Sequence, residues 1–302
     1  RHDDQPRGNP GVSEDLYFDA PFILGMMRLH ERPDFNEPAK LANWLEARVD
    51  QGLHWFDHAD IYGNHQCEQL FGEALSHRPA LKSRVRVVTK GDIVLPHRDT
   101  SPFGVKHYDT SERYLTQVID SSLSRLGVDR LDHFLLHRPD PLMDAEATAR
   151  ALDDAITDGK VGAVGVSNFL PEQWRRLQAA MHNRLGVHQL ELSLAHPDAL
   201  FDGFYDAILA DGLAPMAWSP LGGGSVFEDV LGTALSRLAD QLNSTTAGLA
   251  LAWLRRLPGQ PIPVIGTLNE RRIDNLLLSS NLELDRPTWF ALLEEARSYR
   301  VP

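Results

Sequence analysis

Several features that mark particular protein classes are scarce or absent in this chain of 302 residues. It has one cysteine, Cys67, so it cannot form an intrachain disulfide, and this usage fits a reducing compartment such as the cytoplasm. No apolar run approaches the roughly 20 residues that span a bilayer. A formal net charge of −12 argues against nucleic acid or an anionic membrane as the main partner. We therefore expect a cytoplasmic globular protein that binds neither.

Two kinds of motif are also missing. No Gly-x-Gly-x-x-Gly follows the first strand candidate, and no change in composition marks a domain boundary, which argues against a doubly wound open sheet. No His-x-x-x-His pair falls in a helix candidate, and there is no cysteine pair to hold a metal. Three histidines near two carboxylates leave a metal site as an alternative: His54, His58 and His65 beside Asp57 and Asp60. Because strand alternation puts His54 and Asp57 on opposite faces, we expect no catalytic metal.

What the chain does have is a regular alternation of short β-branched or aromatic runs with longer amphipathic segments. The strand candidates are residues 22–26, 53–57, 85–90, 133–137, 161–166, 188–192, 215–218 and 261–265. Helix-length stretches between them include Glu37–Asp50, Glu112–Leu126, Glu146–Asp158 and Pro171–His182. Eight strands that alternate with helices predict an α/β protein with a single (β/α)8 TIM barrel. We expect residues 1–16 to form a flexible N-terminal leader and residues 17–302 the barrel.

One connection is unusually long. The segment Gly91–Asp109 has no helical period and carries two prolines and several charges. Connections in compact domains usually take about 2 to 6 residues, and longer ones tend to be functional or disordered. It leaves the third strand at the mouth of the predicted barrel, so we interpret it as a substrate-covering loop.

Polar residues end several of the predicted strands. Asp57, Lys90 and His137 close the second, third and fourth, and Tyr62 lies on the loop just after Asp57. In barrel enzymes the active site lies at the C-terminal ends of the strands. A phenol has an ordinary pKa of about 10 and becomes a useful proton donor only when a fixed cation stabilises its anion. Taken singly, Asp57 could be a helix cap or turn residue, and Tyr62 an aromatic packed by its own loop. Lys90 could be a solvated charge at the rim of the barrel, and His137 could bond to its own loop. The joint pattern favours catalysis.

Several segments together resemble the signature motifs of the aldo-keto reductases. They are Phe56–Gly63, Thr89–Lys90, Leu136–Arg138, Gly165–Phe169, Trp218–Gly224 and Ile265–Thr267. The likeness runs in family order from about Phe22 to Pro302. It looks closest to the bacterial YdhF-like branch, on Asp60–Gly63, His137–Asp144 and Met216–Ser219.

This resemblance implies NAD(P)H-dependent reduction of aldehydes or ketones to alcohols by hydride transfer. Tyr62 would donate the proton, Lys90 would lower its pKa, and Asp57 would fix Lys90. His137 would orient the substrate carbonyl and share its developing charge. The chemistry is consistent, because hydride addition builds negative charge on oxygen that a donor beside a cation stabilises, and no side chain supplies a hydride.

The resemblance also implies a cofactor lying extended across the barrel mouth. Ser167, Asn168 and Gln189 would hold the nicotinamide carboxamide, Trp218 would stack on its ring, and Met26 would add to the wall. The segment Ser219–Gly224, with Leu221 and Gly223, could wrap the pyrophosphate, since glycine lets backbone N–H groups approach phosphate closely.

The adenosine end would bind in the last motif, at Gly266, Thr267 and Asn275, where a helix N-terminus favours an anion. Arg271 or Arg272 could grip a 2′-phosphate by a bidentate contact, which favours NADPH. NADH remains an alternative, because many relatives carry a lysine near Ile265 and this chain has none there.

Two rival functions remain open at this point. One is a regulatory protein that binds the cofactor on the same scaffold with little turnover, and the other is a metal-dependent barrel enzyme. The complete set of four catalytic candidates favours an NADP-dependent oxidoreductase. We expect a small-molecule carbonyl substrate and leave its identity open, along with the choice between a monomer and a small homo-oligomer.

Overall fold

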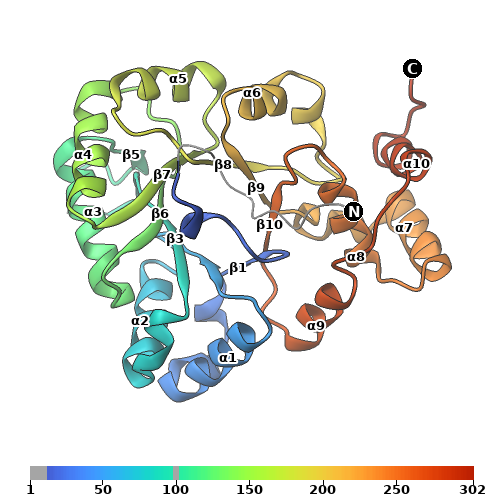
Figure 1. The fold of residues 1–302 in the computed structure, drawn as a ribbon, viewed down its shortest axis with the longest axis horizontal. Helices are drawn as coiled ribbons and strands as arrows, with labels where there is room; N and C mark the ends of the chain where they lie inside the picture. Colours follow the sequence, from blue (N-terminus) through green and yellow to red (C-terminus); the bar gives the residue numbers. More distant parts are fainter. Residues whose placement is uncertain (1–11, 98–101) are drawn as a thin grey trace.

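The computed structural model describes residues 12–97 and 102–302, and its centre is a closed barrel of eight parallel strands (Figure 1). In order around the barrel these are β1 (Ile23–Gly25), β10 (Ile262–Ile265), β9 (Ala214–Trp218), β8 (Val187–Glu191), β7 (Val161–Ser167), β6 (Leu131–Leu136), β3 (Arg86–Lys90) and β2 (Trp55–Asp57). Pairing of β1 with both β10 and β2 closes the ring. The predicted (β/α)8 barrel is confirmed, and the open sheet is excluded.

Helices surround the barrel and connect its strands. They are α1 (Pro38–Asp50), α2 (Gln66–His77), α3 (Glu112–Leu126), α4 (Ala145–Thr157), α5 (Pro171–Ala180), α6 (Phe204–Ala210), α7 (Asp229–Gln241), α8 (Thr246–Arg255), α9 (Glu270–Leu278) and α10 (Arg286–Arg297). Local chemistry sets their ends. Ser111 caps α3 by accepting from the Tyr114 N–H, and Gly127 ends it in the left-handed conformation. No helix in the described part of the chain is long and apolar enough to cross a membrane.

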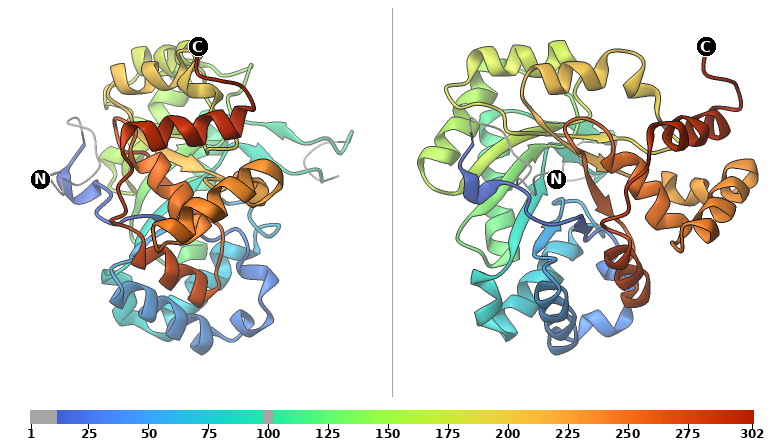
Figure 2. Two further views of the ribbon diagram at one scale, coloured as in Figure 1. Left: turned by 90° about the vertical axis from the view of Figure 1, so that its right-hand side faces the viewer. Right: turned by 45° about the vertical axis from the view of Figure 1, so that its right-hand side comes forward.

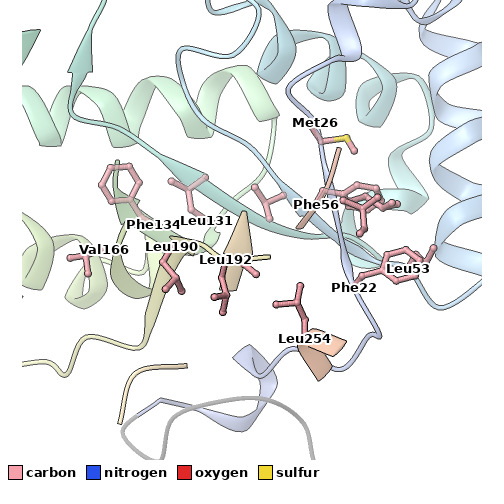
Figure 3. Packing of buried hydrophobic residues seen from close by; sticks show 14 of the residues in the cluster. Phe22, Met26, Leu53, Phe56, Leu131, Phe134, Val166, Leu190, Leu192 and Leu254 are labelled. Carbon is pink, nitrogen blue, oxygen red and sulfur yellow. The ribbon is translucent and has the colours of Figure 1, made fainter. Parts of the chain in front are cut away.

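The apolar core has two parts because strand side chains alternate between the faces of the barrel wall. Outward residues such as Phe56 and Phe134 pack under the helices in the larger cluster, part of which Figure 3 shows. Their neighbours Trp55 and Leu135 point inward and belong to the smaller cluster.

A segment before β1 closes the N-terminal end of the barrel. Phe18 belongs to the inner cluster, and its ring meets Trp55 edge to face at 4.9 Å. The His133 ring nitrogen Nε2 lies 2.8 Å from the Leu16 carbonyl oxygen. Residues 1–11 of the predicted leader lie outside the described residues. Its last three, Glu14–Leu16, form a short 3-10 helix (η1) with Leu16 buried.

The long connection after β3 contains a small antiparallel hairpin. Its strands are β4 (Ile93–Val94) and β5 (His107–Tyr108), with Ile93 opposite Tyr108. The sequence did not predict this hairpin, because two residues per strand are too few to show alternation. The hairpin's connection includes residues 98–101, which lie outside the described part.

The last helices gather on one side of the barrel, where Figure 2 shows α7 and α10 next to each other. Trp253 of α8 and Trp289 of α10 stack with ring centroids 4.6 Å apart. Each indole N–H donates to the other residue's carbonyl oxygen, at 3.1 and 3.0 Å. This reciprocal contact joins the C-terminal helix α10 to α8.

Candidate active site

Polar side chains replace apolar ones where the inward-facing rows reach the C-terminal end of the barrel. Along β2, inward Trp55 is followed two positions later by Asp57, and along β3, Val88 is followed by Lys90. His137 directly follows β6 and has the parity of an inward position. Alternation therefore directs all three side chains into the same opening.

Lys90 is the centre of the site. Its ammonium Nζ donates to Asp57 Oδ2 at 2.7 Å, to the His58 carbonyl oxygen at 2.8 Å and to the Tyr62 hydroxyl at 3.0 Å. Lys90 and Asp57 are almost completely buried. These three acceptors satisfy all three ammonium protons, so the charge is held in one position. The Asp57 carboxylate also accepts from Gln189 Nε2, at 2.9 Å.

The surroundings set the protonation states of these groups. Burial alone would lower the pKa of Lys90, but the charge of Asp57 and the Tyr62 hydroxyl outweigh it and raise that pKa above 10.5. Burial raises the pKa of Tyr62 above 10.0, although the neighbouring Lys90 charge acts to lower it. The lowering expected from Lys90 is present, but burial is the larger effect. Tyr62 is therefore protonated at neutral pH, as a proton donor must be.

His137 lies beside the phenol. The two rings are edge to face with centroids 6.2 Å apart. Burial, followed by the positive charges of Lys90, Arg138 and Lys106, lowers the pKa of His137 well below 6.5. The imidazole is therefore neutral near pH 7, with one N–H to offer a carbonyl oxygen. Its Nδ1 is buried without a hydrogen-bond partner.

The residues expected around the nicotinamide form one hydrogen-bonded network. Asn168 Nδ2 donates to the Ser167 hydroxyl at 3.1 Å and to the His137 carbonyl at 3.2 Å. Its Oδ1 accepts from Trp218 Nε1 at 2.9 Å. Ser167 in turn donates to the carbonyl oxygen of Gln189 at 3.0 Å. The structure thus brings these four residues together with Asp57 and His137 at the mouth.

Two residues of this region have unusual backbones. Asn168 follows β7 with φ of 63°, and Ser219 follows β9 with φ of 45°. Asparagine tolerates the left-handed region, but serine adopts it less readily. Strained backbone is concentrated at functional sites. The same conformation at two strand exits therefore supports a common functional role for these turns.

The glycine-rich turn after Leu221 has open backbone. Gly222, Gly223 and Gly224 all have positive φ, from 61° to 100°. A Cβ at Gly223, Gly224 or Gly266 would meet nothing within 4 Å. The Gly222 and Gly224 N–H groups donate to the Ser219 and Leu221 carbonyl oxygens at 2.9 and 3.1 Å, so what this turn offers a phosphate is the open space beside Gly223 and Gly224.

The remaining cofactor candidates are less closely connected to the four catalytic candidates, which we call the tetrad. Arg271, Arg272 and Asn275 lie exposed on α9, and Thr267 precedes it. No hydrogen bond or ion pair within residues 12–97 and 102–302 joins these side chains to Asp57, Tyr62, Lys90 or His137. Met26 is buried, and its backbone N–H donates to the Asp57 carbonyl at 2.8 Å.

Two of the histidines that raised the metal alternative lie in other surroundings. His54 lies 2.7 Å from Asp19. His58 is fully buried against Phe71, and burial, helped by the Lys90 charge, lowers its pKa to about 3. No group of three or more His, Cys, Asp or Glu side chains among the described residues is placed to hold a metal.

Two features of the mouth were not found from sequence. A cavity of about 410 Å³ lies between the hairpin and the turn after β6, lined by Lys106, His107, Tyr108, Asp140, Pro141 and Leu142. Asp92, two residues beyond Lys90, is completely buried beside the His137 turn. An acidic residue at a strand exit was the available signal for Asp92, but its partner depends on tertiary structure.

Comparison with known proteins agrees with this geometry. The profile of the Aldo/keto reductase family matches residues 21–295. The chain is 41% identical to a 6-dehydroglucose reductase of Agrobacterium fabrum, over 89% of this chain and 92% of that protein. It is 39% identical to the oxidoreductase YdhF of Escherichia coli, over 93% and 95%. A solved aldo-keto reductase from Klebsiella pneumoniae, in complex with NADPH, shares the fold with a TM-score of 0.75 at 24% identity, over 93% of this chain and 91% of that chain.

These matches confirm the family and the YdhF-like resemblance predicted from the motifs. The family profile spans most of the chain, and the first two relatives match over nearly their whole lengths. The chain therefore belongs to the aldo/keto reductase family.

Proposed function

We propose that this protein reduces an aldehyde or ketone to an alcohol, with NADPH as the hydride source and Tyr62 as the proton donor. The observation that carries the proposal is the buried Lys90 ammonium, which lies 3.0 Å from the Tyr62 hydroxyl and 2.7 Å from Asp57. This arrangement places a fixed positive charge where the phenolate forms when Tyr62 loses its proton.

The protonation states support this direction of proton transfer. Tyr62 starts protonated, and neutral His137 can donate one N–H to the carbonyl oxygen. As negative charge builds on that oxygen, Tyr62 releases its proton, and Lys90 stabilises the phenolate that remains. Asp57 keeps Lys90 protonated and in place. When bound, the nicotinamide cofactor supplies the hydride.

The residues present fit a dinucleotide. Trp218 offers a ring for stacking, and its indole N–H is held by Asn168 Oδ1. The open backbone at Gly223 and Gly224 leaves room for phosphate. Exposed Arg271 and Arg272 on the first turn of α9 support a contact with a 2′-phosphate, and this favours NADPH over NADH.

A sugar-like carbonyl compound is our first proposal for the substrate. Two relatives, 41% and 36% identical, are named 6-dehydroglucose reductases. The cavity between the hairpin and the turn after β6 has polar groups from His107, Tyr108 and Asp140 that can bond hydroxyl groups. We further propose that the protein works in the cytoplasm on this small molecule, as a monomer or small homo-oligomer, without nucleic acid or membrane.

The test has two stages. Tryptophan fluorescence is titrated with NADPH and, in parallel, with NADH, and NADPH oxidation is then followed with 6-dehydroglucose and a panel of aldehydes and ketones. We expect saturable quenching by NADPH and turnover of at least one carbonyl. Binding without turnover would favour the regulatory alternative. If neither nucleotide bound, the reductase proposal would fail.

A further inference from the structure

A buried carboxylate holds the peptide that follows His137. Asp92 lies just after β3, and its side chain is completely buried. Its Oδ1 and Oδ2 both accept the backbone N–H of Arg138, at 3.0 and 3.3 Å. Because Arg138 is the next residue after His137, this bond acts on the turn that sets the position of the imidazole.

The turn after β6 in turn bonds the connection that carries Asp92. Asp140 Oδ2 accepts from the Thr110 hydroxyl at 2.7 Å and from its N–H at 3.3 Å. The other oxygen of Asp140 accepts from the Leu142 N–H at 2.8 Å. The Asp92 carbonyl accepts from the Asp109 N–H at 2.8 Å. Two carboxylates therefore exchange bonds between the β3–α3 connection and the β6–α4 connection, a pairing that we call the carboxylate clasp.

The location of the clasp relates it to the active site. The cavity of about 410 Å³ opens between the same two connections, with Tyr108 on one side and Leu142 on the other. Lys90 and His137 lie at the strand ends where these connections begin. The clasp therefore fixes the distance between the strand end that carries the cation and the turn that carries the imidazole.

Burial of the Asp92 side chain costs more free energy than a purely structural contact with a backbone N–H would justify. No ion pair within the described ranges joins its carboxylate to a cation. Burial raises its pKa well above 3.8, and the charges of Asp60 and Asp140 add to this, while the backbone N–H groups of Arg138 and His137 oppose it. A buried carboxylate of this kind calls for an explanation beyond packing.

We propose that Asp92 is a positioning residue, which holds the His137 imidazole beside the Tyr62 ring by fixing the Arg138 peptide N–H. This inference rests on the proposed carbonyl reduction. Asp92 touches neither substrate nor cofactor in this scheme, and its effect on the rate passes through His137. It should therefore affect kcat more than cofactor binding.

The test is a double-mutant cycle in the holoenzyme. Asp92→Ala removes the acceptor, Asp92→Asn keeps one acceptor oxygen, and each is made alone and in a His137→Ala background. We expect Asp92→Ala to lower kcat by about 10- to 100-fold, as misplaced catalytic groups do, with the NADPH Kd unchanged. Asp92→Asn should retain most of the rate. In the His137→Ala background, Asp92→Ala should cause no further loss.

Asp202→Ala is the matched control. The Asp202 carboxylate also accepts a backbone N–H, that of Phe204 at 2.9 Å, but it takes no part in the clasp or in the His137 turn. We expect kcat to stay unchanged in this variant. If Asp92→Ala does not fold, as judged by near-ultraviolet circular dichroism, Asp92→Ser replaces it, with an expected loss in the same direction.

Three results would overturn the inference: an unchanged kcat in Asp92→Ala, an equal loss with and without His137, or an Asp92→Asn variant as slow as Asp92→Ala. Wild-type turnover separates this failure from that of the proposed function. If the wild-type protein turns over a carbonyl and Asp92→Ala matches it, only the positioning role is wrong. If the wild-type protein turns over none, both are wrong.

Discussion

The two ends of the barrel use the same strands but differ in their chemistry. At the N-terminal end Phe18, Trp55 and other apolar residues fill the interior, and the segment before β1 covers it. At the C-terminal end the interior holds a buried ion pair, a neutral imidazole with an unpartnered nitrogen, and non-glycine residues with positive φ. The fully buried ion pair of Lys90 and Asp57 thus lies at the end where carbonyl chemistry is proposed, and the apolar ring packing lies at the other, as expected when stability and function occupy opposite faces of a barrel.

The contrast between the two ends is tested most strongly by a substitution in the apolar cluster at the N-terminal end. Phe18→Ala removes a ring that is only 2% exposed in the inner cluster. We expect it to lower the free energy of unfolding by about 3–5 kcal/mol, the usual cost of deleting a buried aromatic ring, and to leave kcat unchanged. Urea unfolding and steady-state kinetics measure the two quantities. A large fall in kcat at unchanged stability would contradict the assignment of stability to the N-terminal end and catalysis to the C-terminal end.

Asp60, a buried acid two residues before Tyr62, should make the free energy of unfolding depend on pH. Burial, with Glu68 nearby, raises the pKa of Asp60 from 3.8 to about 7. The folded state therefore holds a proton that the unfolded state has lost, so this group's contribution makes stability fall as pH rises from about 4 to 7. Asp60→Asn should remove this pH dependence. Each unit by which the folded pKa exceeds the unfolded pKa corresponds to about 1.4 kcal/mol of stability.

Urea unfolding of wild type and Asp60→Asn between pH 5 and 8 checks this. The advantage of the variant should grow up to about pH 7 and then level off. Asp129→Asn, which changes an exposed carboxylate, is the control and should show no such trend. A constant difference between Asp60→Asn and wild type across the range would show that Asp60 is ionised throughout.

The glycine turn allows a comparison within the open end. A Cβ at Gly222 would lie 2.3 Å from Ser225 Oγ and 2.9 Å from Ala195 Cβ, whereas one at Gly223 would meet nothing. Both have positive φ, so both alanines strain the backbone by about 1 kcal/mol. We expect Gly222→Ala to lower cofactor-free stability more, by about 1–3 kcal/mol in total. Equal melting temperatures in the two variants would contradict the packing argument.

The smallest predicted effect concerns the choice of cofactor. Arg271→Ala and Arg272→Ala remove exposed guanidinium groups from α9. If either side chain binds a 2′-phosphate, its loss should weaken the binding of NADPH by about 1 kcal/mol, or roughly fivefold, and leave the binding of NADH unaffected. Fluorescence titration measures both affinities, with Arg286→Ala on α10 as the control. Parallel changes for the two nucleotides would remove the argument for NADPH from these arginines.

The sequence was sufficient to predict the barrel and the gathering of the tetrad. Eight strands with helices between them specify the fold, and alternation then directs Asp57, Lys90 and His137 inward at one end. The bonds that link Asn168 to Trp218 and Gln189 to Asp57 depend on strand register, which the sequence does not reveal. The net pKa of Tyr62 was also beyond it, because the pKa reflects a balance between burial and the Lys90 charge.

The clasp could not be predicted for a related reason. Asp92 and Arg138 are 46 positions apart in sequence, and their bond exists only because β3 and β6 are neighbours in the barrel. The hairpin that brings Thr110 to Asp140 has strands of two residues each, which is below the length at which a pattern is visible. Its predicted role as a cover for the substrate stays a prediction.

The most direct test of the central claim is the rate of carbonyl reduction by Tyr62→Phe with NADPH bound, against Tyr299→Phe on the exposed C-terminal tail as the control. We predict that Tyr62→Phe binds NADPH as the wild type does but loses turnover by about 10²- to 10⁴-fold, because only the proton donor is removed. Tyr299→Phe should retain the full rate. Near-wild-type turnover by Tyr62→Phe would contradict the assignment of Tyr62 and, with it, the account of the open end of the barrel.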